Sequence, residues 1–275
     1  MHDRSQFSIQ HSAFNISLTV AIIARDEERH IADAIRSVQG LANEVLVLLD
    51  SRSQDETHRI CEYLGARVEV EAWHNFSVQR NLALAHCHTH WLLFLDADER
   101  VTPELYQEIK HILTPDPQYL RPEVVGYWIP RRNLFFGKAV RGGGWYPDHQ
   151  LRLLRCGHAH YDETRIVHEL ARLDGEAGFL TSHLVHLNIE HIHELWNKQR
   201  SYAIQEAQTM FLAGKRARWR NLLGAPLREF YRRFVQLGGW HDGRLGLLLC
   251  GTLAFFEFIK YVHLFALQKP ATYNS

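Results

Sequence analysis

Two aspartates, Asp96 and Asp98, stand one residue apart directly after an unbroken apolar run, Trp91–Leu95. A short run of this kind is typical of a strand that is buried on both faces. The carboxylates would then leave the strand at its carboxyl end, where open α/β sheets bind their ligands. Paired carboxylates can hold a divalent cation, and the cation can hold a diphosphate. The segment therefore predicts a metal and diphosphate site, with Asp98 as the direct metal ligand and Asp96 assisting.

Further polar residues are expected at the same edge of the sheet. Asp50 ends a second apolar strand, and it would accept hydrogen bonds from a base or ribose. The first strand ends at Ala24, and Glu27 in the following turn is the expected ligand contact there. Arg80, on the helix before the Asp96 strand, would face a pyrimidine or a phosphate. The alternatives are that Asp50 only caps a turn and that Arg80 is a surface side chain.

The elements that position these residues alternate between strand and helix. Apolar runs predict strands at 18–24, 45–49, 68–70 and 91–95, and helical spacing predicts helices at 31–38, 53–65, 75–85 and 102–113. Ser53 and Glu56 have the spacing of a capping box for the second helix. The pattern predicts an α/β fold with a mostly parallel sheet and helices on both faces. Short strands follow near 127–130 and 151–154, and the chain is helical from about residue 190.

The composition is that of an ordinary folded protein. The 275 residues carry 31 basic and 31 acidic side chains, so the formal net charge is zero and we expect no nucleic-acid partner. The four cysteines form no CxxC pair, which argues against a disulfide framework and fits a reducing compartment. Residues 1–16 form a polar leader without the apolar core of a secretory signal.

The C-terminal third indicates an association with a membrane. A basic block, 215–233, precedes a strongly apolar stretch, 245–267, that Glu257 and Lys260 interrupt. Charges near the middle of a span are unfavourable, and these two lie three residues apart, where they can pair on one polar stripe. We expect a helix that lies in, or dips into, the interface, with the basic block facing anionic lipid. The alternatives are a solvated basic face and a buried helix that packs on the catalytic domain or on a second subunit.

These motifs in this order resemble the family 2 glycosyltransferases. The matching segments are Val20-Ala21-Ile22-Ile23-Ala24-Arg25-Asp26-Glu27, Glu44 to Ser51, Ser53-Gln54-Asp55-Glu56-Thr57, Gln79-Arg80-Asn81-Leu82-Ala83 and Leu93 to Glu99. The chain departs from the family at Arg52, where Gly is common, and at Gln54, where Thr is common. Segments 127–133, 143–155 and 167–169 are similar to the lipopolysaccharide core glycosyltransferases within that family.

The resemblance implies a GT-A nucleotide-sugar-binding domain over 17–190 and a helical, membrane-associating region over 191–275. It implies an inverting transfer that uses Mg²⁺ or Mn²⁺, with a UDP-sugar as donor and a glycolipid or lipopolysaccharide core as acceptor. It places the catalytic base at Asp148, with Glu169 as the second candidate. It gives His168 a metal or diphosphate contact, with a structural histidine as the alternative. Trp145 would offer an aromatic face to the sugar of the donor, and the alternative is a core tryptophan. The implied location is the cytoplasmic face of a bacterial inner membrane.

Two other functions compete with this one. A sugar-1-phosphate nucleotidyltransferase would share the α/β sheet and the acidic ligands, but a Gly-rich basic loop should follow its first strand. Here that turn is Arg25-Asp26-Glu27-Glu28, which is acidic and lacks Gly. A non-catalytic, membrane-docked scaffold on the same fold is the third possibility, and the intact carboxylates argue against it.

Overall fold

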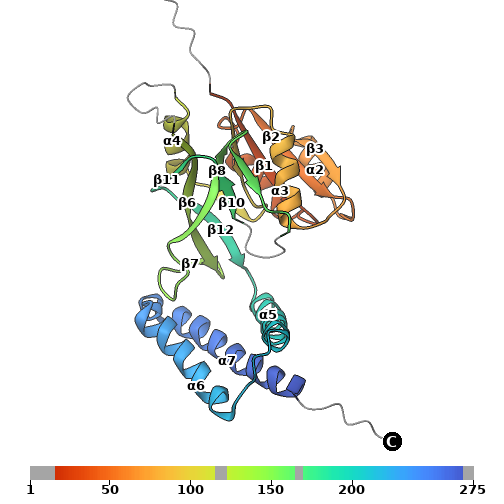
Figure 1. The fold of residues 1–275 in the computed structure, drawn as a ribbon. Coiled ribbons are helices and arrows are strands. Elements are labelled where there is room, and N and C mark those ends of the chain that lie inside the picture. Colours follow the sequence, from red (N-terminus) through yellow and green to blue (C-terminus); the bar gives the residue numbers. More distant parts are fainter. Residues whose placement is uncertain (1–15, 115–122, 165–169, 269–275) are drawn as a thin grey trace, which may run out of the picture. The chain divides into compact units, whose positions relative to one another are not determined.

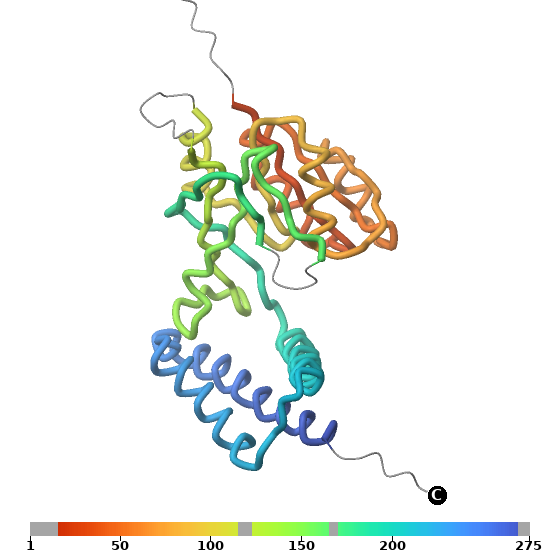
Figure 2. The backbone as a smooth tube through the Cα atoms, viewed as in Figure 1, coloured from red at the N-terminus to blue at the C-terminus, as the bar shows by residue number. Residues whose placement is uncertain are grey.

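The structure is a computed structural model, and it describes residues 16–114, 123–164 and 170–268. The chain divides into two compact units, Met1–Ile129 with Leu151–Ser182, and Pro130–Gln150 with His183–Ser275. Figure 1 shows the strands and helices of each unit, and Figure 2 traces the same backbone. The polar leader lies almost wholly outside the described residues.

The first unit alternates strands and helices, as the sequence predicts. Its elements are β1 (Leu18–Ala24), α1 (Ile31–Ser37), β2 (Glu44–Asp50), α2 (Thr57–Tyr63), β3 (Arg67–Glu71), α3 (Phe76–Ala85), β4 (Trp91–Phe94), β5 (Glu99–Val101), α4 (Pro103–Ile112), β9 (Ala159–Tyr161), β10 (Ala171–Leu173) and β11 (Glu176–Phe179). Two long strands, β6 (Val124–Phe135) and β8 (Asp148–Arg155), run through both units.

The sheet of the first unit is mostly parallel. Within the described residues it belongs to a ten-stranded sheet in which β3-β2-β1-β4-β8-β6 are neighbours in this order. Strand β1 pairs in parallel with β2 on one side and with β4 on the other, whereas β8 is antiparallel to β4. Placing β1 between β2 and β4 brings the carboxyl ends of all three strands to one edge. The predicted α/β fold class is therefore confirmed.

Apolar residues on both faces of this sheet are buried. Alternate residues of β1 point to opposite faces. Ala21 joins a cluster with Leu46 of β2 and Ala83 of α3, so α3 covers that face. Val20 and Ile22, on the opposite face, are also fully buried. Burial on both faces is why these strands have no polar alternation and appear in the sequence as continuous apolar runs.

The second unit is built around three long helices. They are α5 (Ile192–Leu212), α6 (Trp219–Phe230) and α7 (Gly243–Gln268). The π-helix η1 (Tyr231–Gln236) and the 3-10 helix η2 (Gly239–Asp242) connect α6 to α7. Both α5 and α6 pack on α7, as Figure 1 also shows. Strand β12 (Leu184–Ile189) pairs in parallel with β6, and β7 (Lys138–Ala139) pairs with it antiparallel. Residues 130–150 and 183–190 thus group with the helices.

One apolar helix stands out in the described part of the chain. The segment Gly239–Gln268 has a mean hydropathy of 1.7 and is long enough to cross a membrane, a test that core helices also pass. The predicted pair of charges on it is present, because Lys260 Nζ lies 2.5 Å from a carboxylate oxygen of Glu257.

Two local predictions were wrong. Helix α2 starts with no side-chain cap from Ser53 or Glu56; instead Asp55 accepts hydrogen bonds from the backbone N and the hydroxyl of Thr57. The structure also pairs Cys87, which follows α3, with Cys156 at the end of β8, across 69 residues of sequence. Sequence spacing could not predict this pair, because it depends on the adjacency of β4 and β8.

Candidate active site

The structure brings the predicted residues of the first unit to one edge of its sheet. Ala24 ends β1 and pairs with Leu49, the residue before Asp50 at the end of β2. On the other side of β1, strand β4 leads through Leu95 to Asp96 and Asp98. The convergence that the sequence predicted for these residues is therefore observed.

The turn after β1 is held by the loop after β2. The hydroxyl of Ser53 accepts a hydrogen bond from the backbone N of Asp26, and that of Thr57 accepts one from Glu27 at 2.7 Å. Asp55 accepts from the backbone N of Glu28 at 2.9 Å. Hydroxyl and carboxylate acceptors in segment 53–57 thus fix the backbone of the 26–28 turn. This explains the polar composition of the 53–57 motif.

Glu27 lies in a crowded acidic corner. Burial raises its pKa first, and the negative charges of Asp98, Asp55, Asp96 and Asp26 raise it further, to about 7. Glu27 is therefore within electrostatic reach of both members of the Asp96/Asp98 pair. A site with this concentration of carboxylates attracts a cation, and that fits the predicted metal position.

Asp96 is held by a buried arginine. Both terminal nitrogens of Arg152 donate to the two oxygens of Asp96, one of them at 3.1 Å. Arg152 also donates to Glu99 at 3.0 Å, and Glu99 is fully buried. Burial would lower the pKa of Arg152, but the charges of Asp96 and Glu99 raise it above its usual range. This bidentate contact orients Asp96 and supports giving the direct metal contact to Asp98.

Asp50 is buried and is paired with the residue that departs from the family pattern. Arg52 donates from Nη2 to Asp50 Oδ2 at 2.6 Å and from its backbone N to Oδ1 at 2.9 Å. The side-chain hydrogen bonds from Arg52 lower the pKa of Asp50 to about 2. Asp50 thus does cap the turn that follows β2, which was the alternative to a ligand-binding role. The Arg52 side chain is 53% exposed, so its guanidinium lies at the solvent side of this carboxylate.

Arg80 packs on aromatic rings below the same sheet edge. Its Cζ lies 5.6 Å from the ring centre of Phe94, two residues before Asp96, and 5.3 Å from that of Tyr161. Its Nε is buried and has no hydrogen-bond partner among the described residues. The rings hold the cation in place, which is a different environment from that of a surface arginine.

The other two described candidates, Asp148 and Trp145, belong to the second unit. Arg131 donates from Nη2 to Asp148 Oδ2 at 2.6 Å, and Gln150 donates to Oδ1 at 2.7 Å. Burial raises the pKa of Asp148, but the charge and hydrogen bonds of Arg131 and the amides of Gln150 and Asn133 lower it more. The net pKa lies below the ordinary value, so the carboxylate is ionised at neutral pH.

Asn133 links Asp148 to Trp145. Its Nδ2 donates to the carbonyl oxygen of Trp145 at 2.9 Å and reaches Asp148 Oδ2 at 3.4 Å. Its Oδ1 lies 2.6 Å from Nδ1 of His186, and both side chains are buried. Asp148, the candidate base, and Trp145, the candidate sugar-stacking residue, therefore both contact the buried amide of Asn133. Nothing in the sequence indicated this role of Asn133.

Sequence reasoning also missed Arg152 and Glu99. Glu99 follows the Asp96/Asp98 pair directly, and its position gives no sign that it is buried. A signal for Arg152 did exist, because a charged residue inside Leu151–Leu154, an otherwise apolar strand, needs a buried partner. Glu169 and His168, the second base candidate and the third metal candidate, lie outside the described residues. No cluster of three or more His, Cys, Asp or Glu side chains suited to a metal occurs in the part of the chain that the structure describes.

Comparison with known proteins agrees with this geometry. Residues 19–145 match the family described as Glycosyl transferase family 2, and this range holds all the candidate residues of the sheet edge. The chain is similar to the lipopolysaccharide core biosynthesis glycosyltransferase LpsC of Rhizobium meliloti (strain 1021), with 28% identity over 89% of this chain and 90% of that protein. It is also similar to the uncharacterized glycosyltransferase RP128 of Rickettsia prowazekii (strain Madrid E), with 27% identity over 90% of this chain and 86% of that protein.

Among solved structures, the chain is similar to glucosyl-3-phosphoglycerate synthase from Mycobacterium tuberculosis in complex with Mn²⁺, UDP and glucosyl-3-phosphoglycerate. The identity is 18%, the TM-score is 0.33, and the match covers 43% of this chain and 44% of that chain.

The α/β sheet and the match to the family model together define a glycosyltransferase. Residues 19–145 of the chain are a family 2 glycosyltransferase domain. Over most of its length the chain is similar to one lipopolysaccharide core biosynthesis glycosyltransferase, LpsC.

Proposed function

We propose that this enzyme is an inverting, metal-dependent glycosyltransferase that moves a sugar from a UDP-sugar onto a lipid-linked or lipopolysaccharide-core glycan. The observation that carries the proposal is the meeting of Asp50, Glu27, Asp96 and Asp98 at the ends of β1, β2 and β4. The similarity to LpsC, which extends over most of both chains, supports the proposed acceptor class.

The carboxylates of the first unit suit the donor. Asp98, with Asp96 assisting, would hold Mg²⁺ or Mn²⁺, and the ion when bound would neutralise charge on the leaving diphosphate. His168 is proposed as a further contact to the ion or the diphosphate. Asp50 would accept hydrogen bonds from the base or ribose, with Ala24 and Glu27 beside it. Arg80, fixed between two rings, would face the pyrimidine or a phosphate.

The proton of the acceptor hydroxyl is assigned to Asp148. As the hydroxyl oxygen attacks the anomeric carbon, the bond to the diphosphate breaks and the carboxylate accepts the proton. Its low pKa makes it a weak base, so it takes the proton late, when the hydroxyl has become acidic in the transition state. Arg131 and Gln150 hold its two oxygens, so its orientation is set before the acceptor arrives.

The donor proposal is tested by measuring nucleoside diphosphate release from a panel of nucleotide sugars. The full chain should release UDP from at least one UDP-sugar with Mg²⁺ or Mn²⁺ present, and EDTA should stop the reaction. If no nucleotide sugar is cleaved with either ion, the enzyme does not use such donors and a non-catalytic scaffold becomes the better account.

The base is tested with two variants at the competing carboxylates. Asp148→Asn should lower transfer to an acceptor about 10²–10⁴-fold, the usual contribution of a general base, whereas Glu169→Gln should change it little. The reverse pattern, with full transfer by Asp148→Asn and none by Glu169→Gln, would move the base to Glu169.

We also propose that the second unit docks on an anionic membrane surface. Trp219, Leu223 and Leu227 are spaced four apart on α6, so they lie on one face, and they are 79%, 71% and 69% exposed. An apolar groove of about 370 Å³ lies between this helix and α7. Exposed apolar stripes of this size mark contacts with lipid or protein.

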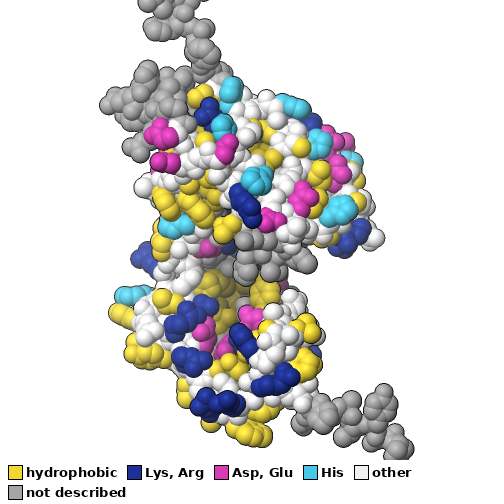
Figure 3. All heavy atoms as spheres, viewed as in Figure 1, with side chains coloured by type: hydrophobic (Ala, Val, Ile, Leu, Met, Phe, Trp, Pro, Cys, Tyr) yellow, Lys and Arg dark blue, Asp and Glu magenta, His cyan; other side chains and the backbone are white. Residues whose placement is uncertain are grey.

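Basic side chains flank the same helix. Arg216, Arg218, Arg220 and Arg228 are all exposed. In Figure 3, Lys and Arg side chains alternate with hydrophobic ones over this part of the surface. An apolar stripe bordered by arginines is complementary to acyl chains under anionic head groups. With the related LpsC acting in lipopolysaccharide synthesis, this supports placing the enzyme at the cytoplasmic face of the inner membrane.

Vesicle flotation tests this docking. The full chain should float with vesicles of phosphatidylethanolamine and phosphatidylglycerol, and a Leu223→Glu/Leu227→Glu variant should remain in the dense fraction. A Tyr63→Glu variant, which changes an 84% exposed aromatic residue in the first unit, is the matched control and should float normally. Equal flotation of both variants would show that α6 is not the lipid-facing element.

A further inference from the structure

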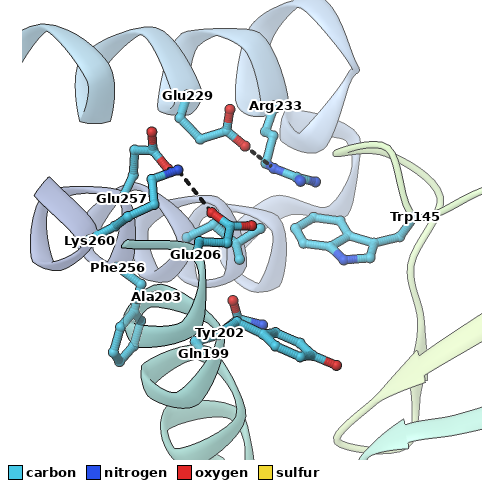
Figure 4. Close-up of a pocket in the computed structure, with 11 residues that line it drawn as sticks. Trp145, Gln199, Tyr202, Ala203, Glu206, Glu229, Arg233, Phe256, Glu257 and Lys260 are labelled. Atoms are coloured by element: carbon cyan, nitrogen blue, oxygen red, sulfur yellow. Dashed lines mark hydrogen bonds and ion pairs between the residues drawn. The ribbon is translucent and has the colours of Figure 1, made fainter. Parts of the chain in front are cut away.

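The second unit contains a polar cavity that the donor chemistry does not use. It has a volume of about 300 Å³, within the range of small-molecule sites. Figure 4 shows Trp145 entering from the loop before β8, with Gln199, Tyr202 and Glu206 on α5 and Glu257 and Lys260 on α7. A second cavity of about 180 Å³ is lined by Trp145, Gln199 and Tyr202 as well. Together they form an extended site with two aromatic rings.

The aromatic wall of this cavity is fixed in place. Arg233 lies 5.3 Å from the ring centre of Trp145, and the ring packs edge-on against Phe135 at 5.6 Å. The guanidinium of Arg233 also donates to the carbonyl oxygen of Gly143 at 2.8 Å. At Gly143 the φ angle is +67°, and a Cβ would lie 2.1 Å from the Trp145 ring. Only glycine therefore allows the loop to fold against the indole.

The two cations that line the cavity are already paired with carboxylates within it. Lys260 Nζ lies 3.0 Å from Glu206 and 2.5 Å from Glu257, and Arg233 donates to Glu229 at 2.5 Å. Three carboxylates face two cations, so a phosphate entering the cavity would meet net negative charge. A neutral molecule rich in hydroxyl groups avoids this repulsion, and its hydroxyls can bond to the Gln199 amide and the Glu206 carboxylate.

Aromatic rings beside amide and carboxylate groups suit a sugar. The C–H face of a pyranose stacks on an aromatic ring, and its hydroxyls pair with planar polar groups. Trp145 is tied through Asn133 to Asp148, the proposed base. A sugar on Trp145 would thus be held by the loop that leads into Asp148, the group that receives its proton.

We infer that this cavity binds a neutral sugar residue of the acceptor glycan, which stacks on Trp145 and Tyr202 and bonds through its hydroxyls to Gln199 and Glu206. That the bound sugar belongs to the acceptor rests on the proposed function. That the cavity binds a sugar is argued from its lining residues alone. It moves Trp145 from the donor sugar, where the family resemblance placed it, to the acceptor.

The experiment measures binding of methyl glycosides to the full chain without donor, by saturation-transfer NMR. The probes are methyl heptopyranoside and methyl glucopyranoside, with glucose 6-phosphate as the charged counterpart. At least one neutral glycoside should bind, and the phosphate should bind more weakly. Tyr202→Ala and Gln199→Ala should each weaken binding about tenfold, the effect of losing one good stacking or hydrogen-bonding contact.

Matched controls separate this site from the rest of the unit. Tyr231→Ala and Gln208→Ala remove exposed residues of the same types that lie outside the cavity, and both should bind the glycosides as the unaltered chain does. Binding that is unaffected by Tyr202→Ala and Gln199→Ala, or tighter binding of the sugar phosphate, overturns the inference. So does the absence of glycoside binding in protein that releases UDP from a donor. Absence of UDP release with normal, cavity-dependent glycoside binding would instead contradict the proposed function.

Discussion

Strand β1 and helix α6 use apolar residues in opposite ways. In β1 every residue but Ile23 is buried, and the carboxylates appear only where the strand ends. In α6 the large apolar residues Trp219, Leu223 and Leu227 face outward, while polar groups of the second unit line an open cavity. The first arrangement builds a rigid edge for ionic chemistry. The second leaves apolar surface exposed, and the proposed docking on a membrane would cover it.

The largest effect on stability is expected at the buried charges of the first unit. Arg152→Met would leave Glu99 ionised and buried without its partner, which destabilises by about 3–5 kcal/mol. Arg172→Met, at a 59% exposed arginine that pairs with Asp162, should change stability by about 0–1 kcal/mol. Urea denaturation followed by circular dichroism measures both. Similar midpoints for the two variants would show that the buried Arg152–Glu99 pair is not needed to hold the sheet edge.

A middle-sized effect is expected at the arginines of α6. An Arg220→Gln/Arg228→Gln variant should lose about 1 kcal/mol of membrane affinity per arginine, or about fivefold each, at low salt. Raising the salt concentration should reduce the difference, because it screens exposed charges. Vesicle titration at two salt concentrations measures this. A difference that does not change with salt would mean that the arginines act through packing.

The smallest effect is expected at Glu108 of α4, which accepts backbone hydrogen bonds from Thr181 and Ser182 at 2.9 and 2.8 Å. Burial raises its pKa, but these hydrogen bonds lower it more, so the net pKa lies below the ordinary 4.5. A lowered pKa contributes stability that is complete above pH 4.5 and is lost as the pH falls through the folded value.

Glu108→Gln should therefore be less stable than the unaltered chain by about 1 kcal/mol at pH 7, and this gap should close below pH 4.5. Thermal denaturation at pH 7 and pH 4 measures the gap. A gap that widens on acidification would have the wrong sign for this explanation.

Much of the sheet and its carboxylates could be predicted from the sequence. Strands buried on both faces leave continuous apolar runs, and Asp50, Asp96 and Asp98 each follow one, so a parallel sheet brings them together. The partners of these carboxylates could not be predicted. Arg152 meets Asp96 across 56 residues, because β8 turns back antiparallel to β4, and local spacing does not encode such a pairing.

The second unit was less predictable for the same reason. Helical periodicity located α5 and the apolar stretch of α7, and the spacing of Glu257 and Lys260 predicted their pairing. It could not show that this pair lines a cavity with Trp145, which comes from a loop more than a hundred residues earlier. Nor could it indicate that 130–150 groups with the helices, since that depends on contacts distant in sequence.

Asp98 is proposed to hold the metal ion that binds the nucleotide diphosphate, and Asp148 is proposed to accept the proton of the acceptor hydroxyl. Calorimetric titration of the full chain with UDP and Mn²⁺ tests this division of roles most directly. The account predicts Mn²⁺-dependent UDP binding that Asp98→Asn abolishes and that Asp148→Asn leaves within about twofold, since a base needed only in the transition state adds little to ground-state binding. Binding of UDP that is independent of Mn²⁺, or equal in the Asp98→Asn variant and the unaltered chain, would contradict it.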